Sequence, residues 1–177
     1  HIKKLKERKN MYKTYYASPI GPILILTDAN ALLGLWFEGQ KYFGAGYDLE
    51  QAQEEETAVS RRVFTWLDAY FKGANPATDE IPLAPQVTEF RSKVLTVLRK
   101  IPYGQTATYS DILRELQAEY GKIGSARAVG GAIGHNPISL LIPCHRIVGS
   151  DGKLTGYAGG LDKKDFLLKL ETRQGLQ

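Results

Sequence analysis

Residues 110–136 read SDILRELQAEYGKIGSARAVGGAIGHN, and their pattern indicates how the second half of the chain folds. Ser110 can cap a helix that runs through residues 111–120. Residues 121–124 begin and end with glycine and predict a short turn. Ser125 can then cap a second helix, which is rich in small residues. Two short helices joined by a glycine-containing turn are typical of a helix-turn-helix.

The second of these helices contains glycine at positions 130, 131 and 134. Glycine costs about 1 kcal/mol relative to alanine at each helix position, so three of them need a reason. One explanation is tight packing against another helix of the protein. The other is the close approach of an external backbone, such as a DNA groove. On the sequence alone we favour packing.

The chain before this region has a different pattern. Residues 12–37 contain β-branched and aromatic runs, broken at residues 19–22 and 28–30, and these runs predict strands. An acidic, polar loop follows. Residues 60–72 then carry apolar side chains at helical spacing, and Gly73 stands where a helix would end. Strands followed by one helix predict a small α/β unit.

A proline-containing stretch separates this unit from the helix-turn-helix. Residues 74–88 include three prolines and show little periodicity, as a linker does. Further helices are predicted over residues 88–99 and 162–172. We therefore expect an N-terminal α/β domain over residues 11–85 and a mainly helical C-terminal domain over residues 86–177.

The charge is distributed unevenly. The 177 residues have a formal net charge of +4, and residues 1–10 account for all of it. Because these ten residues open on histidine and stop just before Met11, we expect an added, processed or disordered leader. Residues 91–177 carry 13 basic and 7 acidic side chains, whereas residues 11–90 carry 5 and 11. A polyanion would prefer the second half, although a solvated surface of uneven charge explains the numbers equally well.

Composition excludes several classes of protein. No apolar run approaches the roughly 20 residues of a membrane helix, and the leader lacks the apolar core of a secretory signal. A single cysteine cannot form an internal disulfide, so we expect a cytoplasmic protein. Besides His1, only His135 and His145 are histidines, so cysteine and histidine cannot supply four zinc ligands. We expect no metal and no cofactor.

The only cysteine lies in residues 142–148, IPCHRIV. A lone cysteine is usually a small buried hydrophobe. The thiolate is the reactive form, and a free thiol has a pKa of about 8.5, so Cys144 would need the base and cation that His145 and Arg146 offer. In an extended segment Cys144 and His145 point to opposite faces, so their contact requires a water or a sharp turn. Glu171 is the candidate for orienting the imidazole.

Each of these neighbours also has a plainer reading. His145 can be a satisfied structural histidine, Arg146 an ion-pair or backbone-capping residue, and Glu171 part of a solvated helix end. Taken singly, each plainer reading is the stronger one. Taken together, the residues form a coherent set for generating a thiolate.

Four stretches carry a resemblance to a known family: IPCHRIV, GSDGKLTGYAGGLDKKDFLLKLE, IPYGQTATYSDI and ARAVGGAIGHNP. They resemble the O6-alkylguanine-DNA alkyltransferases, also called methylated-DNA–protein-cysteine methyltransferases. The resemblance covers essentially all of residues 90–171. It implies a ribonuclease H-like small sheet with a helix, followed by a mainly α domain with a winged-helix-like helix-turn-helix.

The resemblance also implies a reaction. An alkyl group would pass once and irreversibly from O6-alkylguanine in double-stranded DNA to Cys144, after the damaged base is flipped out. His145 would act as the base through a water, Glu171 would hold the imidazole, and Asn136 would hold the local turn. The protein would work as a monomer without a cofactor. Whether O4-alkylthymine is also a substrate stays open.

Further roles follow from the same resemblance. Arg127 would fill the space that the extruded base leaves in the duplex. The other residues that would contact DNA are Tyr109, Ser125, Ala126, Gly130 and Gly131. The residues that would form the base pocket are Tyr109, Ile147, Tyr157, Ala158 and Gly159.

Two other classes of function compete with this one. A helix-turn-helix protein could sense damage or regulate genes without chemistry, but sensor-type relatives lack the acceptor cysteine that this chain has. A cysteine hydrolase would also use a cysteine–histidine pair. Its nucleophile and base normally come from separated segments, which does not fit adjacent Cys144 and His145.

Overall fold

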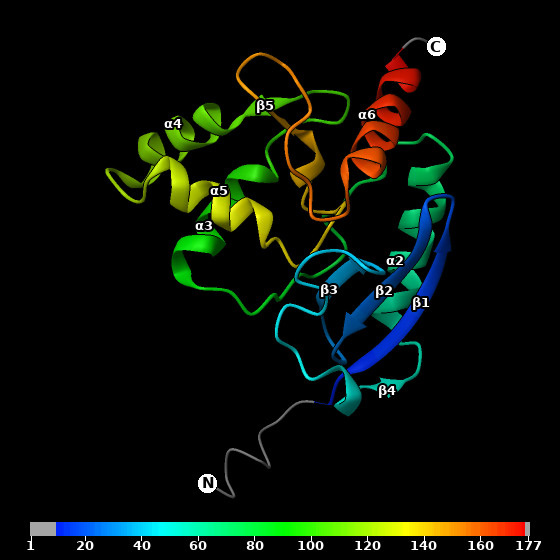
Figure 1. Cartoon of the computed structure of the whole chain (residues 1–177). Coiled ribbons are helices and arrows are strands. Elements are labelled where there is room, and N and C mark those ends of the chain that lie inside the picture. The colour runs from blue at the N-terminus through cyan, green and yellow to red at the C-terminus, as the bar shows by residue number, and fades with distance from the viewer. Residues whose placement is uncertain (1–9, 176–177) are drawn as a thin grey trace, which may run out of the picture.

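A computed structural model describes residues 10–175 of the chain (Figure 1). A sheet with one helix forms the N-terminal part, and four helices form most of the C-terminal part. The leader expected over residues 1–10 lies, apart from Asn10, outside the described residues.

The N-terminal part is built on a four-stranded sheet. Its strands are β1 (Tyr12–Ser18), β2 (Gly21–Thr27), β3 (Leu32–Phe37) and β4 (Gln53–Glu54). Their order is β3-β2-β1-β4, with β2 antiparallel to both neighbours and β4 parallel to β1. The 3₁₀ turn η1 (Leu49–Gln51) precedes β4, and helix α2 (Ala58–Phe71) packs against the sheet. This is the α/β unit that the strand and helix patterns predict.

Strand β2 is buried on both faces, because successive side chains of a strand point in opposite directions. Ile23 and Ile25 enter the main core, which also receives α2. Leu24 and Leu26 enter a smaller cluster with Trp36 on the other face.

The C-terminal part contains the predicted pair of short helices. Its helices are α3 (Glu89–Leu98), α4 (Tyr109–Tyr120), α5 (Ala126–Gly134) and α6 (Leu161–Gly175), and its shorter elements are β5 (Ala107–Thr108), η2 (Cys144–Arg146) and β6 (Ile147–Val148). Helices α3, α4 and α5 pack against one another, and β5 pairs with β6 in parallel.

The helix caps differ in part from those expected. Ser110 does not cap α4: the Thr108 side chain accepts from Asp111 N at 3.1 Å, and Asp111 accepts from Thr108 N at 2.9 Å. This reciprocal capping box satisfies two backbone donors, which a lone Ser110 would not do. Ser125 caps α5 as predicted, accepting from Ala128 N at 3.1 Å. Helix α2 likewise begins before residue 60, because Thr57 is its cap.

The two parts share one core. Phe37 and Leu67 from the first part and Leu98, Ile142 and Leu167 from the second belong to the same buried cluster. Strand β3 also bonds to both later segments: Leu32 N donates to Pro82 O at 2.8 Å, and Leu35 N donates to Pro137 O at 2.8 Å. The stretch that leads to Cys144 is therefore fixed to the edge of the sheet.

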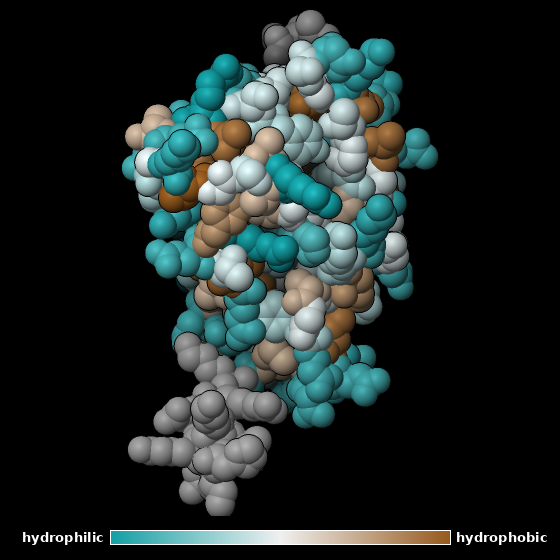
Figure 2. Space-filling view, turned by 60° about the vertical axis from the view of Figure 1, so that its left-hand side comes forward, coloured by the Kyte–Doolittle hydropathy of each residue, from teal (hydrophilic) through white to brown (hydrophobic). Residues whose placement is uncertain are grey.

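The surface is mixed in character. On the face drawn in Figure 2, hydrophobic residues form small separate patches among hydrophilic ones. No helix within residues 10–175 combines the length and the apolar composition needed to cross a membrane.

Candidate active site

Cys144 begins the tight turn η2 rather than lying in an extended strand. Asn136 organises the loop before it: its Nδ2 donates to Ile142 O at 2.9 Å, and its Oδ1 accepts from Ile138 N at 3.0 Å. Cys144 is 6% exposed, and His145 is fully buried. The chain thus turns sharply at these two residues and does not place them on opposite faces of an extended strand.

A hydrogen bond defines the state of the imidazole. His145 Nε2 lies 2.6 Å from Glu171 Oε2. An ionised carboxylate can only accept, so Nε2 carries the proton, and in the neutral ring Nδ1 is the free acceptor. Nδ1 is buried and has no hydrogen-bond partner within residues 10–175. A neutral imidazole with a free Nδ1 is what a general base requires.

Glu171 is the centre of this network. Its carboxylate accepts five hydrogen bonds, two from Arg146 and one each from His145, Tyr70 and Gly104 N, at 2.6 to 3.2 Å. Burial alone would raise the pKa of this carboxyl, but the bonds from His145 and Arg146 outweigh it and hold the pKa below its ordinary value. Glu171 is therefore an anion at neutral pH.

His145 stays neutral for a related reason. Burial lowers the pKa of its imidazole, and the bond to Glu171 opposes this effect without cancelling it. The ring therefore remains unprotonated, and available as a base, at neutral pH.

The cation beside Cys144 is not the one the sequence suggests. Arg146 turns away to Glu171, and its Nη1 donates to Ile101 O at 2.7 Å. Lys164 of α6 is fully buried instead, and its Nζ donates to Thr155 O at 2.6 Å. Burial raises the pKa of the Cys144 thiol, while the Asn136 amide and the Lys164 ammonium oppose the rise.

Sequence reasoning misses both Lys164 and Tyr70. Lys164 lies seven residues before Glu171 and three before Leu167, so the helical period that buries those two also buries Lys164. Tyr70 of α2 donates to Glu171 at 2.6 Å. Its position in an apolar stripe indicates a core residue, and nothing in the sequence marks its hydroxyl as part of the site.

Cys144 faces a cleft of about 240 Å³. Of the residues expected in the pocket or on the DNA, Tyr109, Gly130, Tyr157 and Ala158 line it. Sequence reasoning does not place the other lining residues in the pocket; they are Lys41, Tyr42, Ile133, Gly134 and Gly156. The N-terminal part therefore supplies one wall, and Lys41 N donates to Ala158 O at 3.1 Å to join that wall to the opposite side.

Ile147 and Gly159 are placed differently. Ile147 is in β6, fully buried in the main core. Gly159 packs behind the cleft, where an added Cβ would lie 2.8 Å from the Tyr157 ring and 3.2 Å from the Phe37 ring. Neither lines the cleft.

The face of α5 is open. Ser125, Ala126 and Arg127 are exposed at its start. A Cβ added at Gly130, Gly131 or Gly134 would meet nothing within 4 Å apart from the helix itself. The packing explanation that we favoured for these glycines is therefore wrong, and close approach of an external molecule is the explanation that remains.

Comparison with known proteins gives this arrangement a context. The model of the 6-O-methylguanine DNA methyltransferase ribonuclease-like domain matches residues 11–85, and that of the DNA binding domain matches residues 89–173. The chain belongs to the 6-O-methylguanine DNA methyltransferase family. The family and the fold class expected from the sequence are thereby confirmed.

Relatives in this family match along most of their length. A methylated-DNA–protein-cysteine methyltransferase of Haemophilus influenzae is 41% identical, over 91% of this chain and 86% of its own. One from Methanosarcina acetivorans is 43% identical, over 91% and 98%. The solved structure of Mycobacterium tuberculosis OGT in complex with DNA has 37% identity and a TM-score of 0.80, covering 92% of this chain and 94% of that one.

Whether the chain can hold a metal ion is decided by the arrangement of its potential ligand side chains. Within residues 10–175, no group of three or more histidine, cysteine, aspartate or glutamate side chains is arranged to hold a metal ion.

Proposed function

We propose that this chain repairs DNA by moving an alkyl group from O6-alkylguanine to the sulfur of Cys144, once per molecule. The observation that carries the proposal is the position of Cys144, which faces a cleft directly before the buried His145–Glu171 pair. The relatives' names specify a protein cysteine as the acceptor, and this chain has a single cysteine.

In the reaction, the sulfur attacks the alkyl carbon while the bond from that carbon to O6 breaks. His145 Nδ1 takes the thiol proton through a water, and Glu171 stabilises the imidazolium that forms. Because burial favours the neutral thiol, this base is needed to make the nucleophile.

The electron pair of the broken bond goes to the guanine, which leaves as an anion. A donor near the base would stabilise that charge, and Tyr109, which lines the cleft, is the candidate. The product on the protein is a thioether. No side chain in the cleft can reverse it, so each molecule reacts once.

The damaged base must leave the duplex to reach Cys144, since its O6 lies inside a base pair. We infer that the open glycine face of α5 lies against the minor groove, with Ser125, Ala126, Gly130 and Gly131 close to the strand. Arg127, exposed at the start of α5, would then occupy the space that the base leaves.

The test is an intact mass measurement after mixing the protein with one equivalent of duplex carrying O6-methylguanine. The expected gain is one methyl group in place of hydrogen, located on Cys144 by peptide mapping and saturating at one per protein. Cys144→Ala should bind the duplex and gain nothing. O4-methylthymine in the same duplex tests the second substrate. An unchanged wild-type mass with unrepaired duplex bound would favour the damage sensor instead.

A further inference from the structure

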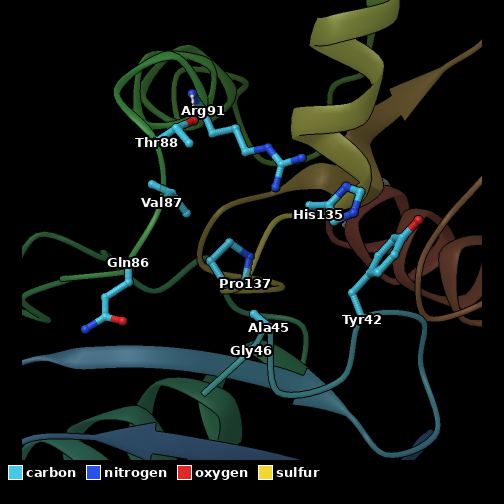
Figure 3. A pocket seen from close by; sticks show the side chains of 9 residues that line it. All are labelled: Tyr42, Ala45, Gly46, Gln86, Val87, Thr88, Arg91, His135 and Pro137. Carbon is cyan, nitrogen blue, oxygen red and sulfur yellow. Dashed lines mark hydrogen bonds between the residues drawn. The ribbon is translucent and has the colours of Figure 1, made fainter. Parts of the chain in front are cut away.

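A second cavity, of about 670 Å³, shares a lining residue with the acceptor cleft. Figure 3 shows the side chains that line it. It opens between the start of α3, the residues that follow α5, and the loop after β3. Among its lining residues are Arg91 and His135, and none of the described residues that line it is acidic. Arg91 is the one permanently charged side chain among these described lining residues, so a charged ligand in this cavity would be an anion.

Arg91 is the main charged group. It lies in the first turn of α3, and its side chain extends across the cavity toward His135 (Figure 3). Its guanidinium makes no ion pair within residues 10–175, whereas the neighbouring carboxylate of Glu89 is paired with Lys93 at 3.4 Å. An unpaired guanidinium presents a planar set of donors that matches a phosphate.

The start of α3 adds a second source of positive potential. Thr88 caps this ten-residue helix and lines the cavity together with Arg91. The partial positive charge at a helix N-terminus favours an anion placed there. The cap and the guanidinium thus favour the same kind of ligand.

Tyr42 connects this cavity with the acceptor cleft, because it lines both. Its ring stacks on His135, with centroids 3.7 Å apart and planes 24° apart. His135 is held in turn by a bond from Nδ1 to Gly131 O at 2.8 Å. The acceptor cleft and the second cavity are therefore neighbours that share the Tyr42 side chain as a common wall.

We propose that the second cavity binds a phosphate of the damaged DNA strand, next to the extruded nucleotide, with Arg91 as its principal contact. The proposal rests on the function proposed above, since it needs a strand with one nucleotide in the acceptor cleft. It adds a DNA contact that lies outside the helix-turn-helix.

The test measures how DNA affinity depends on salt. Proteins carrying Cys144→Ser, which cannot react, are titrated with a duplex containing one O6-methylguanine between about 50 and 200 mM salt. Each phosphate contact contributes about 0.9 to the slope of log K against log salt concentration. Arg91→Gln should therefore make the slope shallower by about 0.9 and weaken binding several-fold at low salt.

Two matched variants make the result specific. Arg99→Gln removes the same charge from an exposed position at the other end of α3 and should leave the slope unchanged. Arg91→Lys keeps the charge and should keep the slope. Equal slopes for Arg91→Gln and Arg99→Gln would overturn the proposal. Methylation of wild-type Cys144, measured separately by mass, reports on the proposed function whatever the slopes show.

Discussion

At the scale of single residues, the site depends on which groups are charged. Glu171 is an anion because its hydrogen bonds outweigh its burial, and His145 is neutral because its burial outweighs its bond to Glu171. Burial and hydrogen bonding compete at both groups, but the stronger effect differs, so the carboxylate stays ionised and the imidazole stays neutral. The pair resembles the base and orienting acid of hydrolytic triads, although here the nucleophile precedes the base directly in the chain.

The pH dependence of transfer should reflect this arrangement. The proposed reaction needs neutral His145, and burial lowers the pKa of that imidazole. The rate should therefore stay on its plateau as the pH falls through about 6.5, the ordinary value for histidine, and decline only below it. Single-turnover rates on O6-methylguanine duplex between pH 5 and 8 measure this. A midpoint above 6.5 would contradict a buried neutral base.

Breaking the ion pair at Glu171 should affect stability. Glu171→Gln leaves Arg146 without its carboxylate in a buried site, which typically costs about 3 to 5 kcal/mol. Urea unfolding at pH 7 measures the loss. The double variant Glu171→Gln/Arg146→Met should recover part of it, because no unpaired charge is then buried. Equal stability of wild type and Glu171→Gln would mean that water reaches Arg146.

The same pair contributes to the acid sensitivity of the wild type. Because the pKa of Glu171 is lower in the folded chain than in the unfolded one, its contribution is complete above about pH 4.5 and is lost as the pH falls below that value.

At the scale of elements, the three glycines of α5 lower the stability of this helix and leave one of its faces open. A Cβ added at any of its three glycines would meet nothing in the protein within 4 Å beyond the helix itself. Their presence is explained if another molecule lies against this helix, as proposed for DNA. The neighbouring α4 has no glycine within its bounds and buries Ile112 and Leu116 in the usual way.

A substitution in α5 separates stability from binding. Gly131→Ala adds a methyl group that meets nothing, so the free energy of unfolding should rise by about 1 kcal/mol. The same methyl group should weaken duplex binding if the face lies in a groove. Urea unfolding and equilibrium titration of Gly131→Ala in a Cys144→Ser background give the two values. A stabilised variant with full DNA affinity would show that this face does not contact DNA.

At the scale of the whole molecule, the acceptor site belongs to both halves of the chain. Tyr70 bonds to Glu171, Tyr42 lines the cleft, and Leu35 fixes the loop that leads to Cys144. The N-terminal part thus contributes residues to the site as well as to the core.

This sharing also marks the limit of prediction from sequence. The strands, the helix-turn-helix and the burial of Glu171 follow from local periodicity, because each pattern repeats within one element. Tyr70 and Lys41 do not, because their roles arise only where distant segments meet. The surroundings of the α5 glycines cannot be predicted for the same reason, since packing between helices cannot be read from one helix alone.

The molecule should treat DNA and free base differently, because the proposed DNA face extends beyond the acceptor cleft. Arg127 is exposed at the start of α5 and does not line the cleft. Arg127→Ala should therefore slow repair of an O6-methylguanine duplex at least tenfold, which corresponds to a loss of about 1.4 kcal/mol in the stabilisation of the extruded base. The same substitution should change the rate of reaction with free O6-benzylguanine less than twofold. Single-turnover rates with both substrates measure the ratio. Equal slowing on both would mean that Arg127 supports the cleft itself and does not replace the extruded base.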